Sequence, residues 1–218
     1  MERTPLIWIL GLITSACLAA GNGKQATQST QSAIGDKNWC TADKQSLLAR
    51  WKEGAADMRL AYCQSESTET HGVTVFSRLD VRQEEVTSGK TIWKIHDETK
   101  MGMTKVNLFR PGFEMLDIDG DGSSETFIGY FFPGDGLEPV DFKFLAHMDG
   151  KKFAIRGQIP RSKEDAAEYK AIHDPAFSQA SPRLRVVADS LFIKFIKTLC
   201  THDDLGLDAP VPVRILPG

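Results

Sequence analysis

The sequence lacks the features that mark several large functional classes. Among its 218 residues, 26 Lys and Arg face 29 Asp and Glu, so no basic excess points to nucleic acid. GxSxG, HExxH, P-loop and GxGxxG patterns are all missing, and so is any internal repeat. Four cysteines in a chain this long fit neither a disulfide-dense small protein nor a CxxC zinc module. These absences exclude more than they establish.

The first 20 residues have the layout of a secretory signal peptide. The apolar run Leu6–Ile13 is too short to span a bilayer as a permanent helix, and small residues follow it. Residues 14–17 (TSAC) resemble the lipobox of bacterial lipoproteins, whose cysteine becomes the lipidated first residue of the mature chain. We therefore expect residues 1–20 to be a signal peptide with Cys17 lipidated. Cleavage after Ala19 or Ala20, which would give a freely secreted protein, is the alternative.

A polar segment separates this signal from the rest of the chain. Residues 21–38 are rich in Gln, Ser and Thr and contain one large apolar residue, Ile34. Such a segment buries too little apolar surface to offset the entropy lost on ordering. We expect a flexible tether over 21–38, followed by a single folded domain over 39–218.

Two-residue periodicity predicts that most of this domain is β-structure. Thr126–Phe132 is apolar on both faces, as in a central strand covered on each side. Pro139–Met148 alternates, with His147 expected on the outward side. The turn 110–112 is expected to separate strands over 104–109 and 113–117. Further strands are predicted at Met58–Cys63, Val73–Arg82, Lys90–Asp97 and Phe153–Arg156.

Helical periodicity appears near both ends of the domain. Thr41–Glu53 is expected to form a short helix that ends before Gly54, and residues 162–172 a second one. Ser181 is expected to cap a longer helix that has Pro182 at its first position. This helix should lie across a sheet through Leu184, Val187, Leu191, Phe195 and Leu199. The predicted fold is α+β: an antiparallel meander with a short N-terminal helix and a packed C-terminal helix.

One motif stands above the background: residues 117–125 (DIDGDGSSE) spell DxDxDGxxE. Calcium prefers oxygen ligands, and carboxylates at alternate positions of a tight loop converge on one point. Four acidic side chains within nine residues repel one another unless a cation lies among them. We therefore predict a calcium site whose ligands are Asp117, Asp119, Asp121, the Ser123 carbonyl and Glu125.

The motif is not an EF-hand. The twelfth position of such a loop is a bidentate Glu, but counting from Asp117 this position is Ile128, and the flanking segments read as strands. The loop is similar to the strand-loop-strand calcium loops of integrin-type propeller repeats, although a propeller needs several copies. Because all ligands lie in one contiguous loop, a structural ion is favoured over a catalytic one. A plain turn with solvated charges is the remaining interpretation.

The other chemistry-bearing residues give weaker signals. Cys40–Cys63 is the first choice for a disulfide, and it requires a chain reversal at Gly54 because one continuous helix would hold the two cysteines apart. Pairs that include Cys200 stay open, as do three separate thiols. His96-Asp97 is a candidate catalytic pair at a strand end. The cluster 202–204 (HDD) follows a helix end, where His interacts favourably with the helix dipole.

Five features follow one another along the chain: 93–97 (WKIHD), the loop 117–125, Tyr130 in the following strand, 139–143 (PVDFK) and 152–157 (KFAIRG). This order resembles a family of small secreted bacterial proteins described as surface polysaccharide biosynthesis proteins. The resemblance covers about half of the chain. This chain lacks two cysteines that many members carry, because no Cys occurs between 64 and 199. The resemblance implies a role with surface glycans and no defined reaction.

These observations lead to three hypotheses. The first is a non-catalytic, calcium-stabilised envelope lipoprotein that binds or scaffolds surface polysaccharide or another envelope protein, anchored to the outer membrane or in the periplasm through its lipid. The second is a secreted calcium-dependent enzyme acting on glycans or phosphoesters, with His96, Asp97 or Asp135 near the ion. The third is a propeller-like module that assembles with its own copies. A cleft that joins His96 to the loop would favour the second.

Overall fold

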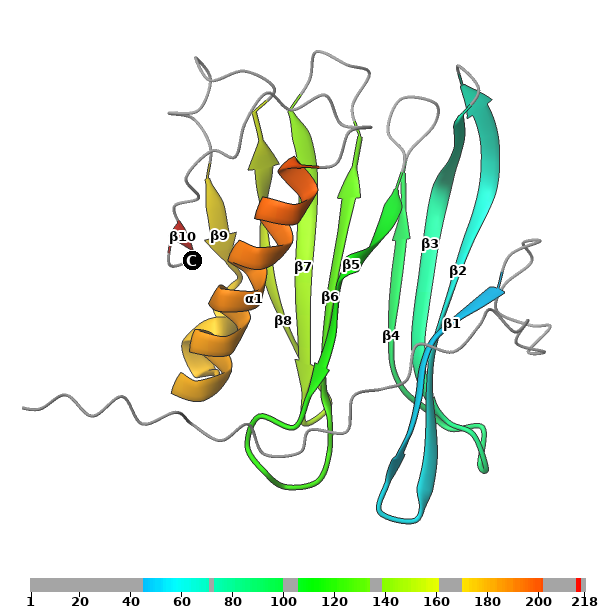
Figure 1. Cartoon of the computed structure of the whole chain (residues 1–218), viewed down its shortest axis with the longest axis vertical. Coiled ribbons are helices and arrows are strands. Elements are labelled where there is room, and N and C mark those ends of the chain that lie inside the picture. The colour runs from blue at the N-terminus through cyan, green and yellow to red at the C-terminus, as the bar shows by residue number, and fades with distance from the viewer. Residues whose placement is uncertain are drawn as a thin grey trace, which may run out of the picture.

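Strands that are neighbours in sequence are mostly neighbours in space (Figure 1). The computed structural model describes residues 45–70, 73–99, 106–133, 139–160, 170–201 and 215–216. Within them, two sheets form in the orders β1-β2-β3-β4 and β10-β9-β8-β7-β6-β5, and only the β9–β10 pair is parallel. The predicted α+β meander is confirmed. The expected signal peptide, Cys17, the tether and Cys40 lie outside the described residues.

The two sheets divide the chain near residue 100. The first contains β1 (Gln45–Glu53), β2 (Ala56–Thr70), β3 (Val73–Glu85) and β4 (Thr91–Glu98). The second contains β5 (Asn107–Leu116), β6 (Glu125–Phe132), β7 (Val140–Met148), β8 (Lys151–Ile159), β9 (Ala171–His173) and β10 (Ile215–Leu216). The 3-10 helix η2 (Pro175–Gln179) then leads to α1 (Pro182–Cys200).

The six-stranded sheet is the middle layer, and β6 is buried on both faces. Phe127 and Phe131 belong to the core cluster that includes Phe192 and Phe195 of α1. The alternate residues Ile128 and Tyr130 belong to a second cluster with the four-stranded sheet. The prediction of a central strand over 126–132 is therefore confirmed, because apolar residues must fill both faces of a strand in a middle layer.

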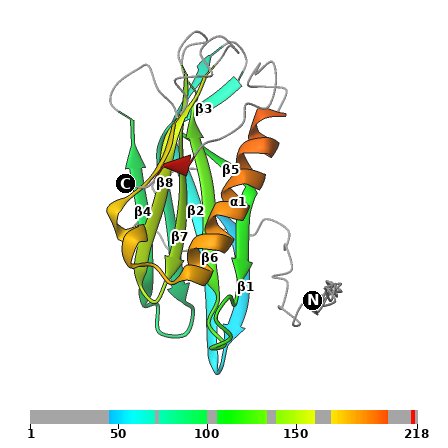
Figure 2. The ribbon, with the colours of Figure 1, turned by 90° about the vertical axis from the view of Figure 1, so that its left-hand side faces the viewer.

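The helix α1 begins and packs as predicted. The Ser181 hydroxyl accepts the Leu184 N–H at 3.1 Å, and Pro182 occupies the first turn. Figure 2 shows α1 running alongside β5 and β6. Leu184, Phe195 and Leu199 are buried, whereas Val187 and Leu191 are half-buried at the margin of the contact. No helix in the described part of the chain has the length and apolar character needed to cross a membrane.

Two glycines allow the ring of Phe195 to lie against the sheet. A Cβ at Gly129 would lie 2.4 Å from Phe195 Cε2, and one at Gly112 would lie 2.6 Å from Phe195 Cδ2. Both distances are shorter than the 3.0 Å below which real Cβ atoms essentially never approach another atom. Close approach of the ring, and not backbone conformation, therefore requires glycine at these positions.

The expected N-terminal helix is wrong, because residues 45–53 form β1. The register with β2 shifts between Leu47 and Ala49, so that a bulge at Leu48 disturbs the two-residue period. Leu47 packs with Ala61 in one cluster, whereas Leu48 and Ala49 join the cluster between the sheets. Bulge and strand together produce an apolar spacing that imitates a helix face. Residues 41–44 lie outside the described part.

Two further expectations are wrong for related reasons. Residues 110–112 do not form a turn but lie within β5, where the register with β6 shifts between Leu108 and Phe113. An edge strand tolerates this bulge and Pro111, because its outer N–H groups need no ladder partner. The second helix does not reach residue 172, because Ala171–His173 is β9 and pairs with β8. Residues 161–169 lie outside the described part.

His147 is not on an outward face. Both faces of β7 are covered at this end, and His147 is 4% exposed and stacked on Trp93 of β4, with ring centroids 3.8 Å apart. Its Nδ1 has no hydrogen-bond partner among the described residues. Burial, and then the positive charge of Lys152 on the paired strand, lowers the pKa of His147 to about 3. The imidazole is therefore neutral in the folded protein at pH 7.

Replacing Gly129 with Ala should lower the free energy of unfolding by roughly 1–3 kcal/mol, because the new methyl group collides with Phe195. Phe195→Leu replaces the ring with a smaller aliphatic side chain and should cost less in the Gly129→Ala background than in the wild type. Urea denaturation of the two single variants and the double variant measures this coupling. Strictly additive losses would show that the ring does not rest on Gly129.

His147→Phe should remove part of the acid sensitivity of the fold. The pKa of His147 is about 3 in the folded state and about 6.5 in the unfolded chain, so only the unfolded chain gains this proton between these values. Stability therefore falls as the pH drops from 6.5, by on the order of 3 kcal/mol at pH 4. Phe keeps the stack on Trp93 but does not titrate.

The measurement is urea unfolding of both proteins at pH 7, 5.5 and 4. Carboxylates elsewhere titrate equally in the two proteins, so the difference between their pH profiles isolates His147. Parallel profiles would contradict the assignment.

Candidate metal centre

The predicted calcium loop connects β5 to β6 at the end of the six-stranded sheet. Gly120 and Gly122 have φ of 85° and 91°, a left-handed conformation that glycine adopts without strain. These two glycines allow residues 117–124 to fold back upon themselves. Consequently, acidic side chains that are separate in sequence face one another.

Three of the predicted ligands converge. Carboxylate oxygens of Asp117, Asp119 and Glu125 all lie within 4.8 Å of one another. Asp121 is not part of this group, and its Oδ1 accepts the Ser123 N–H at 2.6 Å. The structure thus brings together three of the four acidic residues that the sequence predicts.

Backbone N–H groups hold the loop carboxylates in place. Asp117 accepts the N–H of Gly120 at 2.7 Å through Oδ1 and the N–H of Gly122 at 3.1 Å through Oδ2. Asp119 Oδ1 accepts the Asp121 N–H at 3.1 Å. These bonds fix the directions of the side chains, while each oxygen keeps a further lone pair for a cation.

Glu125 is the buried member of the group. Its side chain is 3% exposed, and its Oε2 accepts the Ile118 N–H at 2.7 Å. Burial, followed by the negative charges of Asp119 and Asp117, raises the pKa of Glu125 to about 7. A carboxylate desolvated beside two others gives a strongly negative site, which a divalent cation would relieve.

A residue of the other sheet supports the loop. Glu53 Oε1, at the end of β1, accepts the Ser124 N–H at 3.1 Å and the Trp51 Nε1–H at 2.8 Å. Sequence analysis missed Glu53, because 71 residues separate it from Ser124 and no local pattern joins them. A small cavity of about 150 Å³ lies beside this contact, lined in part by Glu53, Glu125 and His147.

The candidate catalytic pair does not approach the loop. His96 Nδ1 lies 2.8 Å from Asp80 Oδ1 on β3 and borders a groove that contains no loop residue. Asp97 points to the opposite face of β4, because successive side chains of a strand alternate. The groove beside His96 contains no loop carboxylate, and the small cavity beside Glu125 does not contain His96. Asp135 and residues 202–204 lie outside the described part.

Asp97 instead joins the two sheets. Its Oδ2 accepts the Tyr130 hydroxyl of β6 at 2.6 Å and the Lys143 ammonium of β7 at 2.6 Å. Tyr130 is 1% exposed, and burial together with the nearby Asp97 raises the pKa of its hydroxyl well above the ordinary value. This Asp97–Tyr130–Lys143 clamp is a structural role that the sequence did not indicate.

Of the two cysteines in the described part of the chain, one forms a disulfide and the other is a thiol. Cys63 of β2 is fully buried and disulfide-bonded, and Gly54 lies in the turn that reverses the chain between β1 and β2. Cys200 is a buried thiol, so neither alternative that includes Cys200 applies. Because Cys40 lies outside the described residues, the Cys40–Cys63 pair stays a prediction.

The donor set of the loop suits a hard cation. Carboxylate oxygens are the ligands that calcium prefers, and the group contains neither the His nor the Cys side chains that zinc favours. Backbone carbonyls and water would complete the six to eight ligands that calcium takes. The geometry thus fits a structural ion held in a single loop.

Glu53→Ala should weaken metal binding at a distance, because the loop loses its acceptor for Ser124. Glu53→Gln keeps an amide oxygen that can accept the same N–H and should retain wild-type behaviour. Calcium titrations by calorimetry should show a several-fold lower affinity for the Ala variant. Equal affinities for the Ala and Gln variants would show that the contact does not position the loop.

Comparison of the chain with protein-family models, with curated proteins and with solved structures finds no match in any of the three.

Proposed function

We propose that this protein is a non-catalytic, calcium-stabilised lipoprotein of the bacterial cell envelope that binds or scaffolds at the cell surface. The observation that carries the proposal is the convergence of Asp117, Asp119 and Glu125 within 4.8 Å. The sequence adds the lipobox-like Cys17 and the polar tether over 21–38. The family resemblance adds surface polysaccharide as the target.

The calcium part of the proposal rests on the negative charge of the loop and on the contact of the loop with β1. The acidic loop is tied to β1 through Glu53, so an ion bound there stabilises the join between the two sheets as well as the turn itself. An ion that binds only the folded state stabilises it by RT ln(1 + [L]/Kd). Stabilisation by such an ion, which we call the calcium clip, suits a tethered domain that must stay folded outside the cell.

The binding role is favoured over an enzymatic one by the position of the titratable groups. His96 pairs with Asp80, and Asp97 is engaged by Tyr130 and Lys143. His96, Asp97 and the loop residue Glu125 border three different grooves. The alternative of a calcium-dependent enzyme acting on glycans or phosphoesters therefore has no supporting contact among the described residues.

Calcium should raise the melting temperature of the purified domain. At a calcium concentration of 100 times Kd the gain is about 2.7 kcal/mol, which corresponds to about 5–10 °C for a domain of this size. Asp119→Asn should abolish the shift, yet it should be at least as stable as wild type in chelator, because one repelling charge is gone.

Asp149→Asn is the matched control, since it makes the same charge change at an exposed turn residue outside the cluster. Asp149 has φ of 51°, a conformation that Asn adopts readily. Scanning calorimetry with calcium and with excess chelator provides the measurement. A wild-type melting temperature that chelator leaves unchanged would refute the calcium clip.

A further inference from the structure

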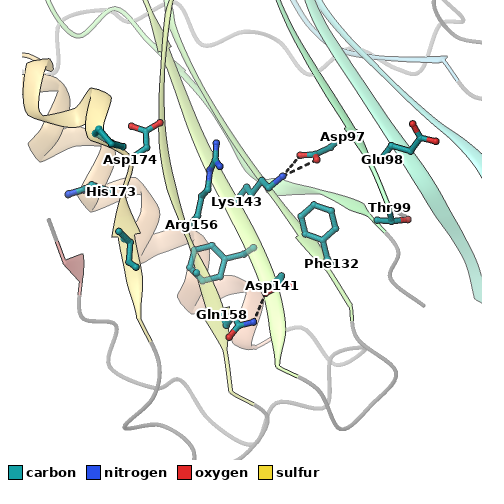
Figure 3. Close-up of a pocket in the computed structure, with 14 residues that line it drawn as sticks. Asp97, Glu98, Thr99, Phe132, Asp141, Lys143, Arg156, Gln158, His173 and Asp174 are labelled. Carbon is teal, nitrogen blue, oxygen red and sulfur yellow. Dashed lines mark hydrogen bonds and ion pairs between the residues drawn. The ribbon is translucent and has the colours of Figure 1, made fainter. Parts of the chain in front are cut away.

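A groove of about 720 Å³ lies far from the metal loop, on the face of the six-stranded sheet opposite α1 (Figure 3). Side chains from β6, β7, β8 and β9 line it, and the end of β4 forms one wall. Its volume is within the range of small-ligand sites. The lining side chains therefore define which ligand the groove fits.

Strand register arranges the floor in two rows. In the first, Lys143 lies opposite Arg156, which lies opposite Ile172 of β9. In the second, Phe132, Asp141 and Gln158 are consecutive cross-strand neighbours. Directly opposite residues point to the same face, so each row presents its side chains to the groove together.

The two cations of the first row differ in their partners. Lys143 Nζ lies 2.9 Å and 2.6 Å from the two carboxylate oxygens of Asp97. Arg156 is exposed, and no hydrogen bond or ion pair joins its guanidinium to any residue that the structure describes. In Figure 3 its guanidinium points into the space between Asp174 and Lys143. Arg156 thus offers its N–H groups to an anion.

The groove also offers oxygen acceptors. Asp141 Oδ1 accepts Gln158 Nε2 at 2.8 Å, which leaves Asp141 Oδ2 for a ligand. Asp174 also borders the groove, and its Oδ1 is buried without a hydrogen-bond partner within the described residues. Carboxylates accept hydrogen bonds and cannot donate them when ionised, so they call for hydroxyl or amide donors.

The charge of the lining narrows the choice of anion. Two cations share the groove with the four carboxylates of Asp97, Glu98, Asp141 and Asp174, so a doubly charged phosphate would be repelled more strongly than a singly charged carboxylate. A carboxylate brings one charge and matches the planar fork of Arg156. Apolar contacts remain for the rest of the ligand, because Phe132 is half-buried and Ile172 is 45% exposed.

We propose that this groove binds an acidic saccharide. Arg156 holds the carboxylate of the sugar acid, Asp141 and Asp174 accept its hydroxyl groups, and Phe132 and Ile172 contact its C–H face. This inference rests on the proposed binding role and names the ligand class for it. It does not depend on the calcium site, from which the groove is separate.

The probe is a tetrasaccharide of alternating glucuronic acid and N-acetylglucosamine, titrated into the mature chain and followed by two-dimensional NMR. Its methyl ester keeps every hydroxyl but carries no charge, and acetate carries the charge without the hydroxyls. We expect binding of the acid form, and affinity at least about 10-fold lower for the ester and for acetate.

Arg156→Gln should lower the affinity for the acid form by about 10-fold or more. Arg183→Gln is the matched control, since the same substitution falls on exposed α1 at the opposite face and should leave binding unchanged. Arg156→Lys should recover part of the affinity, because it restores the charge without the planar fork.

The proposal is overturned by no binding of the acid form at 10 mM, by equal binding of acid and ester, or by an unaffected Arg156→Gln variant. Acetate binding as tightly as the saccharide overturns the roles of Asp141 and Asp174. The calcium-dependent melting shift, recorded on the same samples, separates the two proposals. Binding without that shift refutes only the calcium clip, and the shift without binding refutes only the groove.

Discussion

The burial of β6 on both faces is the constraint on which the rest of the structure depends. A strand in this position must present apolar side chains in both directions, and Phe127 and Ile128 do so from successive residues. Because α1 covers one face and the four-stranded sheet the other, the ends of β6 are positioned from both sides. The loop carboxylates lie at its start and the clamp of Asp97 to Tyr130 near its end.

The same arrangement separates two kinds of electrostatics. At the start of β6, carboxylates gather with no cation among the described side chains, and Glu125 is desolvated among them. Near its end, Lys143 is paired with Asp97, while Arg156 beside it keeps its capacity to bind an anion. The first site suits a metal ion, and the second suits a polar organic ligand. The length of β6 separates the two candidate sites.

Sequence patterns predicted the parts of the fold that depend on a single segment. The strand over 139–148 and the helix after Ser181 follow from periodicity and capping, and the loop carboxylates from their spacing. The patterns failed where a bulge changes the period, as at Leu48. They also failed where a distant element covers a residue, as Trp93 covers His147.

The groove was not predictable for a related reason. Arg156 is an ordinary exposed residue within β8, and only the register places it opposite Lys143. The sequence suggested Asp97 only as one half of a candidate catalytic pair with His96. Alternation along β4 sends the two side chains to opposite faces, which the local sequence implies only when the strand is known to be covered on one side.

The meander topology has a consequence for folding. Since almost every strand pairs with the next one in sequence, each sheet can form through local contacts, with little loop-closure entropy to overcome. The long-range step is the docking of the two sheets. The contacts made then, from Glu53 to Ser124 and from Asp97 to Tyr130, connect residues 71 and 33 positions apart. The docking of the two sheets, which is the last step of folding, therefore also completes the predicted calcium loop and the wall of the groove.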